Sequence, residues 1–346
     1  MDGPLKPNTA LDAAPVYLAL PAVDNLLATP AGLVCSSGTE LISLRREGEA
    51  GLAVAARRSL PAAVTCLAGD GGAGMAIGLD GGGVLIQGGR HDGRMIETAG
   101  GRKLNCPTAV LFLYPDRLLV ANGSATLPAA EWKRDLMSWG ASGRVWRIDL
   151  SGAKPEATPL AEGLAFPFGL ALAGGDALLV SEAWRHRVVR LRLASRAPAA
   201  TVLGDLPAYP GRLLAAAGGG YWLALFAPRN QLVEFVLREH GYRRRMLARI
   251  DPEYWIAPAL SSGASYLEPI QGGARKKLNI MKPWAPTWSY GLLLRCDAEA
   301  RPTASFHSRA DGHVHGVTSV AELDGRLLVG AKGSGVVVGL APGRAA

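Results

Sequence analysis

The chain has 346 residues, of which 49% are hydrophobic and 19% charged, a balance that suits one large unit of all-β or barrel type. It contains 44 Gly and 23 Pro residues, and this abundance predicts many turns and short strands rather than helices. The formal net charge is +8, but the densest basic cluster, 243–249, is short and has no zinc-finger or helix-turn-helix pattern beside it. We therefore expect no nucleic-acid partner.

The four cysteines lie far apart and form no C-x-x-C pair; they are Cys35, Cys66, Cys106 and Cys296. This pattern allows a disulfide but favours small buried thiols. The N-terminus lacks the basic segment of a signal peptide, and its apolar stretch 13–23 is interrupted by Pro15 and Pro21. No apolar run is long enough to span a bilayer, so the predicted location is the cytoplasm.

One pattern recurs six times along the chain: a small residue or Arg, three apolar residues, then small or polar residues. Its copies begin at Gly32, Gly83, Arg117, Ala177, Gly220 and Arg326. Most copies are followed by a second strand-like run, such as 145–150 or 188–193, and these apolar runs are too short for helices. Each unit therefore reads as several antiparallel strands, and six units predict a six-bladed β-propeller in one domain, 1–346.

Two spacings between the repeats are too long and indicate insertions. The segment 124–142 lies inside the third unit and is expected to form a short helix or loop. The fifth unit is interrupted at about 228–288, where 231–250 is a helix candidate, before the strand-like run resumes after Tyr290. Loops this long in a compact domain are usually functional or disordered, and this one is expected to cap one mouth of the propeller.

The last unit ends after Leu340, one strand short, while 16–20 is a spare strand at the other end of the chain. Pairing the two segments would close the ring and remove its open edges. We therefore expect the N-terminal strand to complete the last blade.

Three segments together resemble a known family: LAFPFGLAL followed by ALLVSEAWRHRVVRLRL, then LPAYPGRL with GGYWLALFAPRN, and finally GVTSVAELDGRLLVGAKGSGVV. They are similar to the strictosidine synthase-like branch of six-bladed propellers, which includes the adipocyte plasma membrane-associated proteins. More distantly, they resemble regucalcin–gluconolactonases and paraoxonases. The resemblance runs from about Asp24 to the C-terminus and includes the long insertion in the fifth unit.

The resemblance implies that the inner strand of each blade starts at the mouth of a central channel, where ligands bind. The ligand-binding candidates at these positions are Asp24, Asn105, Thr108, Phe168 and Arg212. In metal-dependent relatives the fourth-blade motif reads Phe-Pro-Asn-Gly, but here Phe168 replaces the asparagine. The fifth-blade motif reads Tyr-Pro-Asp-Asn in many members, but here Gly211 and Arg212 replace the last two residues.

These replacements argue against a central metal. Hard divalent cations need several oxygen ligands, whereas the sequence offers a ring, a glycine and a guanidinium at the motif positions. A neighbouring Arg⁺ would oppose a bound unit charge by roughly 4 kcal/mol at about 4 Å and intermediate dielectric. We expect no metal cofactor; a calcium site using Asp24 with Asn105 or Asn122 is the alternative.

The catalytic candidates lie at the start of the last inner strand: His313, His315 and Thr318. An H-x-H pair on a strand would place both rings on one face. The two rings could then act as a base and its orienting partner, or form part of a metal site. The other interpretation is two solvated histidines in a loop. Strictosidine synthase carries a glutamate in its last blade. The residue of this sequence at the position that resembles it is Thr318. A threonine hydroxyl cannot take over that proton transfer at neutral pH, so Pictet–Spengler activity is not supported.

Two further motifs have mainly structural interpretations. Glu182 stands near Arg185 and Arg187, and we expect an ion pair across the β-turn. The basic segment 238–250 includes Tyr242 and is expected to pack on the propeller rim, with contact to an anionic membrane as the alternative.

The favoured function is therefore that of a strictosidine synthase-like propeller that acts on or binds a small organic molecule in its central pocket. This molecule could be an anion, and the usual metal site is expected to be missing. A calcium-dependent lactonase or arylesterase is the first alternative. A non-catalytic protein or membrane interaction module is the second. Whether the protein is an enzyme, and its oligomeric state, stay open at this level.

Overall fold

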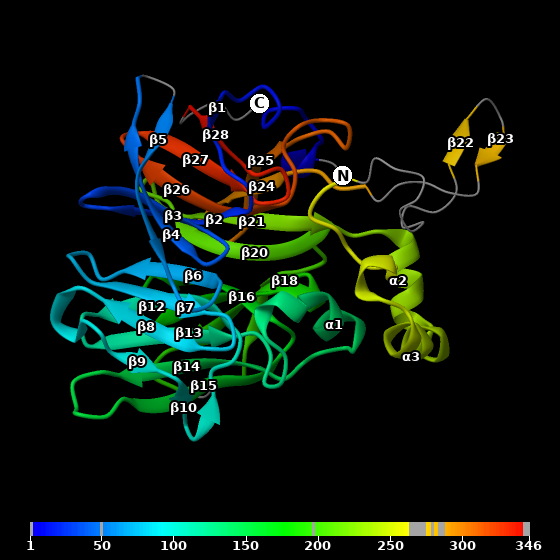
Figure 1. The fold of residues 1–346 in the computed structure, drawn as a ribbon. Coiled ribbons are helices and arrows are strands. Elements are labelled where there is room, and N and C mark those ends of the chain that lie inside the picture. The colour runs from blue at the N-terminus through cyan, green and yellow to red at the C-terminus, as the bar shows by residue number, and fades with distance from the viewer. Residues whose placement is uncertain are drawn as a thin grey trace.

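Six four-stranded antiparallel sheets follow one another around a ring in the computed structural model (Figure 1). The structure describes residues 3–48, 51–195, 198–262, 275–277, 280–282 and 288–341. The first strand of each sheet contacts the first strand of the next sheet, and this chain of contacts closes on itself. The predicted all-β six-bladed propeller is confirmed.

Strands are ordered from the central channel outward in every blade. Blade 1 consists of β2 (Val23–Thr29), β3 (Gly32–Ser37), β4 (Glu40–Arg46) and β5 (Leu52–Ser59). Blade 2 consists of β6 (Val64–Gly69), β7 (Met75–Leu79), β8 (Gly83–Gln87) and β9 (Met95–Ile96). Blade 3 consists of β12 (Pro107–Tyr114), β13 (Arg117–Asn122), β14 (Gly143–Asp149) and β15 (Glu156–Leu164).

The second half of the ring follows the same order. Blade 4 consists of β16 (Pro167–Ala173), β17 (Ala177–Glu182), β18 (Arg187–Arg192) and β19 (Ala200–Leu203). Blade 5 consists of β20 (Ala208–Ala215), β21 (Tyr221–Pro228), β24 (Leu292–Cys296) and β25 (Pro302–His307). Blade 6 consists of β26 (Val317–Leu323), β27 (Arg326–Ala331), β28 (Val336–Leu340) and β1 (Val16–Ala19).

The repeated apolar pattern coincides with the second strand in five blades. These strands are almost entirely buried, because neighbouring blades cover both of their faces. In blade 2 the pattern at Gly83 falls instead on the third strand, β8, while the second strand is β7. Both strands are short, apolar and mostly buried, so the pattern by itself does not distinguish them.

The N-terminal strand completes blade 6, as predicted. β1 pairs antiparallel with β28, with Val16 opposite Val338 (Figure 1). Tyr17 packs into the core between blades 6 and 1, and Gly339 makes room for its ring: a Cβ on that glycine would lie 2.2 Å from the ring. The two ends of the chain therefore hold the ring closed.

Short helices occupy both predicted insertions. The segment 124–142 contains η3 (Ala129–Glu131) and α1 (Trp132–Met137). The fifth-blade insertion contains α2 (Gln231–Arg238), α3 (His240–Arg249), η5 (Pro252–Tyr254), β22 (Arg275–Lys277) and β23 (Ile280–Lys282); the rest of 263–287 lies outside the described residues. Between blades 2 and 3 there is a small hairpin of β10 (Thr98–Ala99) and β11 (Arg102–Lys103), and η1 (Gly3–Leu5), η2 (Gly89–His91) and η4 (Ala183–Arg185) are single turns.

The helix expected over 231–250 is two helices. Asn230 caps α2, because its side-chain oxygen accepts hydrogen bonds from the Leu232 and Val233 N–H groups. The chain leaves helical geometry at Glu239, where ψ is 75°, just before the poor helix former Gly241. The basic segment 238–250 is thus mostly α3, with Arg243 buried and Tyr242 exposed.

The described part of the insertion packs on blades 4 and 5 through one apolar cluster. Val236 of α2, Met246 of α3 and the indole of Trp255 meet Phe226 and Tyr209 there. Figure 1 shows α1, α2 and α3 together at one side of the ring. No helix in the described ranges is long and apolar enough to cross a membrane.

All four cysteines are buried thiols, as the spacing predicted. Burial raises the pKa of each thiol to about 12. A neutral thiol is a poor nucleophile, and all four cysteines belong to apolar core clusters.

Replacing Tyr17 should test the ring closure. We expect Tyr17→Ala to lower the free energy of unfolding by about 3–5 kcal/mol, because it empties a buried site between the first and last blades. Val16→Ala on the same strand is the control, since Val16 is 44% exposed and should matter little. Urea denaturation of both variants measures the difference; equal stabilities would show that β1 does not close the ring.

Candidate functional site

Every inner strand has an irregular register near its start. The shifts lie at 24–27 in β2, 64–66 in β6, 107–109 in β12, 167–169 in β16, 210–213 in β20 and 317–319 in β26. A β-bulge leaves one residue without a partner and redirects its side chain. Six such bulges at equivalent places therefore aim side chains and backbone oxygens into the same channel.

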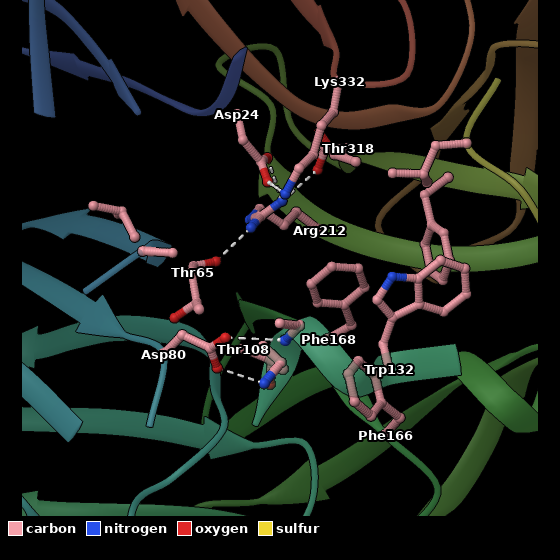
Figure 2. A pocket seen from close by; sticks show the side chains of 16 residues that line it. Asp24, Thr65, Asp80, Thr108, Trp132, Phe166, Phe168, Arg212, Thr318 and Lys332 are labelled. Carbon is pink, nitrogen blue, oxygen red and sulfur yellow. Dashed lines mark hydrogen bonds and ion pairs between the residues drawn. The ribbon is translucent and has the colours of Figure 1, made fainter. Parts of the chain in front are cut away.

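The redirected residues surround a central cavity of about 220 Å³. Asp24, Thr65, Thr108, Phe168, Arg212 and Thr318 line it from the six inner strands. Figure 2 shows Asp24, Arg212 and Lys332 gathered on one side and the rings of Phe168, Phe166 and Trp132 on another. Four of the five predicted ligand-binding residues lie in this lining, together with one predicted catalytic residue, Thr318.

Arg212 is the best-connected side chain of the pocket. Its Nη1 donates to Asp24 Oδ1 at 2.8 Å and to the Thr318 carbonyl at 2.9 Å. Its Nη2 donates to the Thr65 carbonyl at 2.6 Å. The guanidinium carbon lies 5.1 Å from the centre of the Phe168 ring, within cation–π range. One side chain of blade 5 thus binds blades 1, 2 and 6.

Asp24 is shared by two cations. Lys332 Nζ lies 3.1 Å from its second oxygen, Oδ2, and only 5% of the Asp24 side chain is exposed. Burial alone would raise the pKa of this carboxyl, but the charges of Arg212 and Lys332 outweigh burial and hold the pKa below its usual range. Asp24 is therefore ionised at neutral pH.

Aromatic rings form the opposite wall. Phe168 meets Phe166 edge-on at 5.8 Å and Phe226 at 5.3 Å between ring centres. Phe166 is stacked on Trp184 at 4.4 Å, and its backbone is left-handed with φ 57°. Left-handed backbone is costly for a bulky residue and is found mainly where the surrounding structure enforces it. Trp132 of α1 adds its indole, 5.7 Å from Phe226.

The polar side of the pocket is also ordered by hydrogen bonds. Asp80 accepts from the N–H groups of Ala129 and Ala130 at 2.5 and 3.0 Å, which fixes the start of η3. The Thr108 hydroxyl donates to the Pro167 backbone oxygen and lies 3.2 Å from that of Ala121, so it links blades 3 and 4. These contacts hold both side chains in place before any ligand arrives.

Three predicted site residues lie outside this lining. The Asn105 amide donates to the Leu127 carbonyl at 2.9 Å. His313 is 52% exposed beside Asp12, whereas His315 is buried with both ring nitrogens close to backbone carbonyls, of Ser289 at 3.0 Å and Gly312 at 2.9 Å. The two rings do not share a strand face, because the segment is a loop before β26 rather than part of the strand.

The ion pair expected at Glu182 is present. Its fully buried carboxylate contacts Arg185, lies 2.6 Å from Arg187 Nε and accepts from the Ala165 N–H at 2.7 Å. It does not line the central cavity, so its role is to fix the turn after β17.

The donors present do not fit a calcium ion. Both Asp24 oxygens already bond cationic side chains, and Asn122 uses its amide on the backbone of Cys106 and Ser124. Ca²⁺ takes about six to eight oxygen ligands. In the described ranges, no group of three or more His, Cys, Asp or Glu side chains is placed to hold a metal.

Several lining residues were not anticipated from the sequence, chiefly Thr65, Asp80, Trp132 and Lys332. Asp80 and Lys332 directly follow the second strands β7 and β27, and an antiparallel second strand ends beside the start of the first. Lys332 ends a copy of the repeated apolar run, and that position was its available signal, whereas Asp80 follows β7, which is not among the copies of that run. Trp132 comes from an insertion and carried no such signal.

Comparisons with known proteins bear on the fold. No family model and no curated protein matches the chain. A gluconolactonase from Xanthomonas campestris is similar in structure, with a TM-score of 0.58 and 13% identity over 99% of this chain and 95% of that one. The calcium-binding protein regucalcin from Agrobacterium tumefaciens has a TM-score of 0.53 and 14% identity over 94% and 92%. These structures share the six-bladed fold; the strictosidine synthase-like resemblance stays a prediction.

The charge of Asp24 should stabilise the fold in a pH-dependent way. Its folded pKa is depressed, so its contribution is present above the usual value of 3.8 and is lost as the pH falls through the lower folded value. We expect Asp24→Asn to cost about 3–5 kcal/mol at pH 7, and the gap to wild type to shrink below pH 3.8.

Urea denaturation at several pH values measures this gap. Asp324→Asn is the control, because its pair with Arg46 is solvent-exposed and should contribute almost nothing. A gap that is the same at pH 3 and pH 7 would show that the ionised carboxylate is not what stabilises the ring (pH values chosen to bracket the usual pKa).

Proposed function

We propose that this protein binds a small organic anion in its central cavity, with a ring against the aromatic wall and the charge facing Lys332. The observation that carries the proposal is the two-sided lining: Phe166, Phe168 and Trp132 on one side, and Lys332 with hydroxyl groups on the other. Pockets for small molecules are typically apolar with a few converging polar groups.

The volume limits the ligand. An apolar cavity of about 150 Å³ is large enough for benzene. The cavity here, about 220 Å³, accordingly has room for one substituted ring.

Lys332 is better suited than Arg212 to meet the ligand. Arg212 is 14% exposed and commits its Nη groups to Asp24 and two carbonyls. Lys332 is 38% exposed, and its ammonium carries three N–H donors, one of which serves Asp24. We therefore expect Lys332 to contact the anionic group of the ligand, while Arg212 forms the floor of the pocket. Binding of this kind needs no metal.

Ligand binding can be tested with single-ring carboxylates, each paired with its neutral amide. Ligand-observed NMR and thermal shift should favour the carboxylates, and Lys332→Gln should weaken their binding by about tenfold because it removes the facing charge. Lys154→Gln, at an exposed turn, is the control. Equal binding of acids and amides, or no effect of Lys332→Gln, would refute the anion site.

Lactone hydrolysis is the second candidate function, favoured by the structural similarity to a gluconolactonase. In this reaction water adds to the lactone carbonyl carbon, the ring C–O bond breaks, and the alkoxide takes the proton that the water gave up. Asp80 lines the cavity and bonds only backbone N–H groups in the contacts described above, so it is the candidate for holding that proton. The product, a hydroxy acid, carries the charge that Lys332 would attract.

A pH-stat assay with gluconolactone and other lactones, corrected for the rate without protein, tests this activity. We expect turnover that persists with a chelator and falls at least about 100-fold in Asp80→Asn. Asp205→Asn is the control, because that side chain is 94% exposed. Absence of turnover above the background with every lactone would remove this candidate and leave the binding function standing.

A further inference from the structure

Three oxygen atoms from three blades converge on one guanidinium at the centre of the ring. They are Asp24 Oδ1 of blade 1, the Thr65 carbonyl of blade 2 and the Thr318 carbonyl of blade 6, at 2.8, 2.6 and 2.9 Å from Arg212. Thr65 and Thr318 sit in the bulges of their strands, where ladder pairing is interrupted. Their carbonyls therefore need another partner, which Arg212 provides.

A carboxylate and backbone carbonyls are the hard oxygen donors with which proteins usually surround a divalent cation. In this chain the centre of the arrangement is filled by a cationic side chain, and the Phe168 ring covers it. The three residues that supply the oxygens, and Phe168, belong to β-strands of four different blades. The oxygens should therefore stay in place when the cation is changed.

We propose that the ring centre is a cation-binding cage whose cation, the Arg212 guanidinium, is part of the chain. Arg212 joins the three oxygens that a metal ion would join here, with a single positive charge in place of two. It follows that truncating Arg212 will uncover a weak site for a free divalent or guanidinium cation. This inference concerns the floor of the pocket and does not depend on the ligand proposed above.

The charge balance supports this replacement. Asp24 is almost completely buried, so its carboxylate needs compensating positive charge. Without Arg212 it would keep only Lys332, and the Thr65 and Thr318 carbonyls would lose their donor. A small cation entering the vacated space would contact all three oxygens, with water completing its shell, while the charge of Lys332 beside Asp24 would oppose it and keep the affinity low.

The experiment uses Arg212→Ala in the full chain with Ca²⁺ as the probe, followed by calorimetric titration and thermal unfolding. The variant should bind one Ca²⁺ with a dissociation constant on the order of 10⁻³ M, as expected for a site with a single carboxylate. At a tenfold excess over that constant, its unfolding temperature should rise by about 2–4 °C. The wild-type protein should show neither response.

Two control variants separate the cage from general ion effects. Arg212→Ala with Asp24→Asn lacks the carboxylate and should lose the Ca²⁺ response. Arg46→Ala removes an arginine from a pair with the exposed Asp324, and it should not gain a response. Methylguanidinium at millimolar concentration should also stabilise Arg212→Ala, because it restores the missing donors.

Either of two results would overturn the inference: stoichiometric Ca²⁺ binding by the wild type, or a folded Arg212→Ala that binds neither cation. If Arg212→Ala does not fold, Arg212→Gln keeps more of the packing against Phe168 and is subjected to the same titration and the same criteria. Carboxylate binding by the wild type is measured separately, so loss of that function leaves this result interpretable.

Discussion

The bond between Arg212 and Asp24 is the interaction on which the centre of the molecule depends. A propeller brings six strand ends to one channel, where backbone oxygens and a carboxylate would otherwise face one another without donors. Arg212 supplies the positive charge and three hydrogen bonds that link blades 5, 1, 2 and 6. Because Asp24 is almost completely buried, the pair holds only through complementary geometry, and the bulged strands provide that geometry.

The bulges explain how a structural ring also becomes a pocket. In a regular strand the side chains at these positions would follow the pleat and the carbonyls would stay in the ladder. Interrupting the register at one place in each inner strand turns Thr65, Thr108, Phe168 and Thr318 toward the channel. The same local device serves both purposes, since the freed carbonyls anchor Arg212 and the redirected side chains line the cavity.

The aromatic wall connects this pocket to the inserted helices. Phe226 touches Phe168 in the pocket and belongs to the cluster that receives α2 and α3. Trp132 enters the pocket from α1, and Leu260 from the fifth-blade insertion. The apolar side therefore combines ring side chains of the blades with Trp132 and Leu260 of the insertions, while the charged side comes from the blades.

The family resemblance implied that Asp24, Phe168 and Arg212 lie at the channel. The sequence pattern alone predicted the six repeats, the closing N-terminal strand and the buried thiols, because these follow from short-range patterns. It did not separate β7 from β8, since both are short buried runs. Tertiary structure alone decided that His315 is enclosed by carbonyls and that Lys332 reaches Asp24 from 308 positions away. Contacts between residues so far apart in the sequence depend on ring closure and strand pairing, which no local sequence pattern predicts.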